Sequence, residues 1–198
     1  VAIIGVLYSL KISEVLSSSS KIYTAEYEGP LEKDLASINY QSASMDEVTN
    51  RMNEILKKNV EASSVNVYIL SNQNELETAY SSNKLSMKMP VNNPIFDTLL
   101  NNNRNVVIAQ QIEKDHAVSA ITKELTEFFE TTKSDALFIL NEGHNIFGLI
   151  TLGKKASGDH YKEYDYNVFT KLYSYFFVFG YYMRNISNKD IIDVVNRE

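Results

Sequence analysis

The sequence predicts an α+β fold, and three observations support this prediction. Helix-type and strand-type hydrophobic patterns follow one another between residues 44 and 158. Two pairs of strand patterns are joined by short polar turns, which is typical of β-hairpins. A helix pattern that is apolar on nearly every side then runs from Tyr161 to Ile186, so this helix must be covered on more than one face.

The first helix of this region is predicted to begin after Ser44. Ser44-Met45-Asp46-Glu47 is a capping-box sequence, in which the serine side chain accepts an early backbone N–H and Glu47 reaches back. Behind this cap, apolar residues recur at steps of three and four and form one face of a helix. These residues are Met45, Val48, Met52, Ile55, Leu56 and Val60.

The strand patterns alternate with two shorter helices. Residues 64–70 alternate apolar and polar side chains, as a half-buried strand does. Asn93-Pro94 predicts a helix start, because proline is tolerated at the first helical position. The remaining elements are a strand near 76–80, a strand at 85–89 ended by Pro90, a helix at 94–101, a strand at 106–109, a helix at 117–131, and strands at 136–140 and 146–152.

The composition excludes several classes of function. The chain contains no cysteine, which rules out disulfides, thiolate catalysis, cysteine-based zinc sites, iron–sulfur clusters and thioether attachment of a chromophore. The absence of cysteine fits a reducing cytoplasm. The net charge is −6 and the basic residues are scattered, so we predict no nucleic-acid partner.

The order of these elements resembles a GAF domain, a relative of PAS domains. The clearest match is the segment ALFILNEGHNIFGLITLG at 136–153, which resembles the paired last strands of the family. Gly148 and Gly153 stand where the family usually has glycine. Lys154-Lys155, Tyr161 and Asp165 look like the lysine, aromatic and acidic positions that follow. The resemblance covers about residues 43 to 186.

The resemblance implies a GAF-like antiparallel sheet with helices on both faces and long N- and C-terminal helices. It also implies a regulatory sensor domain of a bacterial signalling protein, such as a sensor histidine kinase of a two-component system, a cyclase or a serine phosphatase. We expect a homodimer that binds a small ligand or partner. The binding signal would pass through dimeric terminal helices to a covalently linked output domain. The alternative is a dimerisation or spacer module with no ligand.

The resemblance also implies where such a ligand and such a dimer contact would lie. A cavity is expected behind the segment 93–135, and the dimer contact is expected along the last helix. The candidate lining residues are Met87, Met89, Phe96, Val106, Ile108, His116, Phe128 and Phe138, and the candidate dimer residues are Phe169, Tyr173, Phe176, Phe177 and Tyr181. For the aromatic stripe and the two methionines, ordinary core packing is the simpler interpretation.

No residue pattern indicates catalysis, a cofactor or a metal. His116, His144 and His160 lie in loop patterns, and no pair has the spacing of a helical zinc motif. The cyclic-nucleotide signature of some GAF domains is not met, since the residues Lys123, Glu124, Phe128, Phe129 and Asp135 fit an amphipathic helix. We therefore expect a domain that is not an enzyme, with no cofactor and no metal.

Three segments are expected along the chain: an N-terminal helical leader at 1–43, a GAF-like domain at 44–186 and the start of a C-terminal linker helix at 187–198. The apolar run Val1–Leu10 is about half the ~20 residues that a membrane span needs. It fits the end of a span lying upstream, which would make the leader juxtamembrane, and it fits a buried or dimer-packed helix equally well. The expected location is the cytoplasm, with tethering to the inner membrane by an upstream segment left open.

Overall fold

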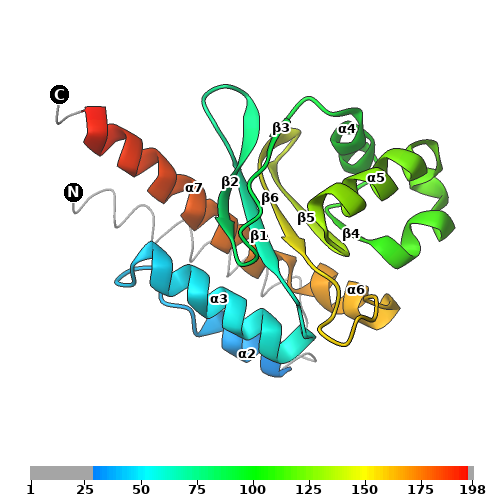
Figure 1. The fold of residues 1–198 in the computed structure, drawn as a ribbon, viewed down its shortest axis with the longest axis horizontal. Helices are drawn as coiled ribbons and strands as arrows, with labels where there is room; N and C mark the ends of the chain where they lie inside the picture. The colour runs from blue at the N-terminus through cyan, green and yellow to red at the C-terminus, as the bar shows by residue number, and fades with distance from the viewer. Residues whose placement is uncertain (1–28, 196–198) are drawn as a thin grey trace.

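The structure is a computed structural model that describes residues 29–195, with side chains as far as Ile186. Its centre is a six-stranded sheet with the order β3-β2-β1-β6-β5-β4, in which every neighbouring pair is antiparallel. Helices α3 and α7 lie on one side of this sheet, and α4 and α5 lie on the other (Figure 1). The predicted α+β fold class, with helices on both faces, is confirmed.

The helices and strands of the described chain are, in order, α2 (Pro30–Ala36), α3 (Met45–Val60), β1 (Val65–Leu70), β2 (Glu75–Ser81), β3 (Lys88–Pro90), α4 (Pro94–Asn101), β4 (Val106–Ile108), the 3-10 helices η1 (Ala109–Lys114) and η2 (His116–Ile121), α5 (Thr122–Thr132), β5 (Ala136–Glu142), β6 (Asn145–Leu152), α6 (Glu163–Lys171) and α7 (Tyr173–Val195).

Both helix starts predicted from capping sequences are confirmed. The Ser44 backbone N–H donates to Glu47 Oε2 at 2.7 Å, and the Glu47 N–H donates to Ser44 Oγ at 3.3 Å, which completes the capping box of α3. The Ile95 N–H donates to Asn93 Oδ1 at 3.0 Å at the start of α4. These bonds satisfy backbone donors that a helix end otherwise leaves unpaired.

The single helix expected at 117–131 is wrong in its first part. The chain forms η1 and η2 there, and α5 begins only at Thr122. Asp115 accounts for this difference, because its carboxylate accepts the Ala117 N–H at 3.0 Å and so caps a separate short turn. Arg104 holds that carboxylate with two bonds, from Nε at 2.6 Å and from Nη2 at 3.2 Å.

The long C-terminal helix pattern also divides in two. Helix α6 ends at Lys171, and Leu172, with φ −97° and ψ 10°, separates it from α7.

Strand β3 begins at Lys88 rather than Leu85, because the Thr78 side chain takes part in the pairing. Its hydroxyl accepts the Met87 N–H at 2.9 Å, in place of a backbone carbonyl.

Helix α2 packs against α3 within the same body as the sheet. Leu31 and Leu35 are buried, and Asp34 accepts hydrogen bonds from Lys58 and Asn59 of α3, both at 2.9 Å. The rest of the expected leader, including Val1–Leu10, lies outside the described residues, and the division of the chain at residues 43 and 186 stays a prediction. Among residues 29–195, no helix combines the length and apolar character that crossing a membrane requires.

Two hydrophobic cores lie on opposite faces of the sheet. The first is formed with α2, α3, α6 and α7, and the second with α4, η1, η2 and α5. Strands β1, β5 and β6 contribute alternate side chains to each core, because successive strand residues point to opposite faces. In the first core the Phe138 ring stacks on Phe176 at a centroid distance of 4.0 Å, and Phe169 meets Phe138 at 5.3 Å.

The candidate dimer residues of the last helices do not share one surface. Phe169 and Phe176 have no exposed area and belong to the intrachain core, so their assignment to a dimer contact is corrected. A helix that is apolar all round gives no sign of which side faces its own sheet. Tyr173, Phe177 and Tyr181 are half-buried, and both Phe177 and Tyr181 meet the edge of the Phe147 ring. The homodimer stays a prediction.

Replacing Phe176 with alanine should lower the free energy of unfolding by about 3–5 kcal/mol, because the change removes a fully buried ring. Phe177→Ala should cause a smaller loss, since this ring is half-buried. Urea unfolding followed by circular dichroism measures both. The core assignment is overturned if Phe176→Ala separates a dimer while the free energy of unfolding of the single chain stays unchanged.

Candidate functional site

The eight candidate lining residues divide between the two cores. Met89, Phe96 and Phe128 belong to the core beneath α4 and α5, and Met87 packs at its margin. Three others point to the opposite face, towards α6 and α7, so they line no common space with the first four. These three are Val106, Ile108 and Phe138.

The error has a simple cause in β4 and β5. Every residue of β4 and the first five residues of β5 are buried, so no polar alternation marks which face each side chain occupies. The residues that do face α4 and α5 are the neighbours of the proposed ones. They are Val107, Leu137 and Ile139.

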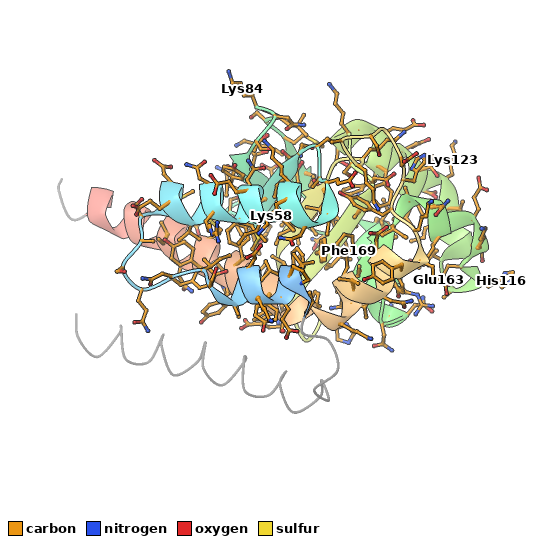
Figure 2. The ribbon with its side chains drawn as sticks, turned by 90° about the horizontal axis from the view of Figure 1, so that it is seen from below. Lys58, Lys84, His116, Lys123, Glu163 and Phe169 are labelled. Carbon is orange, nitrogen blue, oxygen red and sulfur yellow. The ribbon has the colours of Figure 1, made fainter. Side chains whose placement is uncertain are left out.

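His116, the remaining candidate, lies at the surface, as its loop pattern indicates. It begins η2, its side chain is exposed, and it projects from the far edge of the molecule (Figure 2). The adjacent Asp115 carries the structural role at this place, through its pairing with Arg104. His116 therefore contributes nothing to the interior of the fold.

A row of polar side chains lies in the core beneath α4 and α5, and we call Asn66, Tyr68 and Thr151 the buried polar row. Asn66 and Tyr68 are two residues apart in β1 and so share a face. Thr151 of β6 lies directly opposite Asn66 in the antiparallel pairing. All three residues are 0% exposed.

In the buried polar row, Asn66 Nδ2 has no hydrogen-bond partner in the described chain, and Tyr68 Oη and Thr151 Oγ1 make no well-formed hydrogen bond, although these two hydroxyls lie close enough to interact with each other. The Asn66 carbonyl is satisfied, since Ser81 Oγ donates to its Oδ1 at 2.7 Å. Buried polar atoms are paired in the great majority of cases, and an unpaired one costs about 1–3 kcal/mol. Such a group therefore points to a bound water or ligand, or to a functional use.

The surroundings of the row are apolar. Its neighbours in this core are aliphatic and aromatic. Burial raises the pKa of the Tyr68 hydroxyl, and the nearby Thr151 hydroxyl opposes that rise only in part. Tyr68 is therefore a neutral phenol, able to donate and to accept one hydrogen bond or more. The row thus offers one amide donor and two hydroxyls, with no net charge.

Sequence reasoning missed this site because it took Asn66 and Tyr68 as the outward side of a half-buried strand. The sequence shows that apolar and polar residues alternate in β1, but it does not show that α4 and α5 cover the polar side. Thr151 gave no signal of its own within an apolar strand. Only the register of β1 against β6 brings it beside Asn66.

The arrangement of helices and strands is the one that the sequence resemblance implies, and the fold is GAF-like. No protein-family model matches the chain, and no curated protein matches it. Among solved structures it is similar to the GAF domain of nlh2 from A. aeolicus, with 18% identity and a TM-score of 0.40 over 89% of this chain and 98% of that chain. It is also similar to the GAF domain of a two-component sensor histidine kinase from Bacillus halodurans, with 13% identity and a TM-score of 0.46 over 74% and 98%.

A third similar structure is a GAF domain/HD domain protein from Geobacter sulfurreducens. Its identity to this chain is 11% and the TM-score is 0.45, over 77% of this chain and 98% of that chain. At these identities and TM-scores, no residue of the buried polar row takes a role from these structures.

Thr151→Val should raise the free energy of unfolding of the ligand-free chain by about 1 kcal/mol, because it removes a buried hydroxyl that makes no well-formed hydrogen bond and keeps the side-chain shape. The matched control is Thr78→Val, on the same face of the sheet. The Thr78 hydroxyl donates to Met87 O at 3.2 Å and accepts the Met87 N–H at 2.9 Å, so this change should lower stability. Urea unfolding of both variants after dialysis checks this. Equal losses would show that the Thr151 hydroxyl is already satisfied.

Proposed function

We propose that this chain is a regulatory sensor domain that binds a small, neutral, polar molecule at the buried polar row. The observation that supports the proposal is the set of three polar atoms without a well-formed hydrogen bond, Asn66 Nδ2, Tyr68 Oη and Thr151 Oγ1, in an otherwise apolar core. A ligand that completes these hydrogen bonds removes a cost that the empty domain carries. Binding is therefore favoured by the chemistry of the fold itself.

The row also defines the chemistry of the ligand. Asn66 Nδ2 requires an acceptor, such as a carbonyl or hydroxyl oxygen, and the hydroxyls of Tyr68 and Thr151 accept or donate. The ligand carries no formal charge, because the row supplies no counter-charge and a buried unpaired charge is costly. Its remaining surface is apolar, and it packs against aromatic side chains from α4 and α5. Two of these are Phe96 and Phe128, whose rings meet edge to face at 6.1 Å.

The route from this site to α7 passes through the backbone of β1 and β6. Gly148 of β6 lies so close to β1 that a Cβ added there would stand 2.9 Å from Tyr68 O and 3.3 Å from Leu140 Cδ1. Leu140 lies on the face of the sheet away from the buried polar row. There Gly180 of α7 packs directly on Leu140, with no room for a Cβ between them. Tyr68 therefore has its hydroxyl in the ligand core and its carbonyl at the contact that leads to α7.

In the proposed mechanism, ligand binding favours one position of β1 and β6 over another. Because α7 sits on these strands without free space at Gly180, that bias changes how α7 packs. Helix α7 runs to Val195 and would carry the change to a linked output domain. A homodimer formed through the half-buried residues Tyr173, Phe177 and Tyr181 would give α7 a partner to move against.

Native mass spectrometry of the purified 198-residue chain, with a denatured control, tests the binding. We expect a stoichiometric small molecule in the native spectrum that is released on denaturation and does not bind to Asn66→Leu. The control is Asn72→Leu, which changes the same residue type in the exposed β1–β2 turn and should keep the ligand. An apo spectrum for the wild type, together with unchanged stability of Asn66→Leu, would favour the spacer interpretation.

The coupling is tested by Gly180→Ala. In a helix without tight packing, alanine in place of glycine stabilises by about 0.5–1 kcal/mol. Here the added methyl group meets Leu140, so we expect a loss of about 1–3 kcal/mol in stability and a weaker affinity for the copurified ligand. The control Lys57→Ala, at an exposed position of α3, should leave that affinity unchanged. Unchanged ligand affinity in a folded Gly180→Ala variant would contradict the route through Leu140.

A further inference from the structure

A second site is present at the edge of the sheet, away from the buried polar row. It is a cleft of about 720 Å³, and its lining comes from four segments: Ser63 before β1, η1, the second half of α5 with the residues that follow it, and the segment after β6. This volume is within the range of small-molecule sites. The cleft shares no lining residue with the buried polar row.

The polar centre of the cleft is the pair formed by Asp135 and His160. Asp135 is 1% exposed, yet both of its carboxylate oxygens are used. Oδ1 lies 2.6 Å from His160 Nδ1, and Oδ2 accepts the Tyr161 N–H at 2.9 Å. The His160 side chain is 48% exposed and lines the cleft.

This pairing fixes the orientation of the imidazole ring. A buried carboxylate accepts a hydrogen bond, so His160 Nδ1 carries the proton that it donates to Asp135. The second ring nitrogen, Nε2, points away from Asp135 and has no partner among the described residues. A fixed ring with one free polar atom in a cleft is the kind of convergent polar group that orients a ligand.

Charged side chains of both signs line the cleft. Lys133 and Lys154 lie beside the Asp135–His160 pair, because the Asp135 N–H donates to Leu152 O and so joins the start of β5 to the end of β6. Glu113 of η1 and Glu130 of α5 also line the cleft, and Glu130 O accepts the Lys133 N–H at 3.2 Å, so charges of both signs are close together. None of these four charges forms an ion pair within the described part of the chain.

The floor of the cleft is apolar. It is formed by Ala109, Ile112 and Phe129, of which Ile112 and Phe129 are 4% and 5% exposed. A ligand that matches this lining has an anionic group, a cationic group and an apolar body. A polyphosphate matches it poorly, because two carboxylates would face its charge.

We propose that this cleft binds a small zwitterion of the amino-acid type with an apolar side chain. Its carboxylate contacts Lys133 and Lys154, and its ammonium group donates to His160 Nε2 and contacts Glu113 and Glu130. Its side chain packs on Phe129 and Ile112. This ligand differs from the molecule proposed for the buried polar row, which is neutral and enclosed.

The ligand in the cleft acts on the start of α6. His160 precedes Tyr161, whose backbone N–H is held by the same Asp135 carboxylate. The Tyr161 hydroxyl donates to Gly153 O at 2.9 Å, and its ring meets Phe169 of α6 at 5.3 Å. A change at His160 therefore reaches the aromatic core beneath α6 and α7 through one residue.

Isothermal titration calorimetry of the full chain tests this site, with the twenty amino acids as probes. Acetate, butylamine and inorganic phosphate serve as probes that carry a single kind of charge. We expect at least one apolar amino acid to bind more tightly than all three. His160→Asn keeps a donor for Asp135 but removes Nε2, and it should weaken that binding about tenfold to a hundredfold, as should Lys154→Met. The controls His144→Asn and Lys57→Met, at exposed positions elsewhere, should bind like the wild type.

Two results would overturn the proposal. One is the absence of binding heat for every amino acid with folded wild-type protein. The other is amino-acid binding by His160→Asn or Lys154→Met that equals the wild type. Asn66→Leu separates the two sites, since it should lose the copurified molecule and keep amino-acid binding. A negative result at the cleft therefore does not contradict the proposal for the buried polar row. A negative result at the buried polar row likewise does not contradict the proposal for the cleft.

Discussion

The rest of this structure depends on one constraint: strands β1, β5 and β6 are buried on both faces of the sheet. Alternate residues of each strand therefore belong to different cores, and a polar residue on either side must find a partner inside the protein. Ser81 supplies one for the Asn66 carbonyl, and the row beside it is left incomplete. A sheet with one face in water would satisfy the same atoms with solvent, and they would carry no information about function.

The same constraint limits what the sequence predicts. Helices α3 and α4 were predicted correctly because Ser44 and Asn93 are capping residues whose bonds are local. The faces of β4 and β5 were not, because a wholly apolar strand such as Ala136–Leu140 contains no alternation. Phe138 was therefore assigned to the wrong core. The buried polar row requires the pairing of β1 with β6, which is a long-range feature that no local pattern contains.

The C-terminal helices show a related limit. Their apolar surface is continuous, so the sequence indicated that two faces are covered without telling which residues lie on which face. The sheet settles this for Phe169 and Phe176 through their contacts with Phe138. Gly180 was not singled out by any pattern, although it sets how closely α7 approaches Leu140. The prediction therefore failed at positions that are set by close packing between elements distant in sequence.

The two proposed sites reach the same helices by different contacts. The buried polar row acts through Gly148 and Leu140 on α7, whereas the cleft acts through Tyr161 and Phe169 on α6. Both routes end in one aromatic core, since Phe169 and Phe176 meet on Phe138. If each ligand biases the packing of that core, thermodynamic linkage requires each to change the affinity of the other by the same factor. A domain with this arrangement combines two chemical signals before its last helix, and the sign of their coupling depends on whether both ligands favour the same packing of α7.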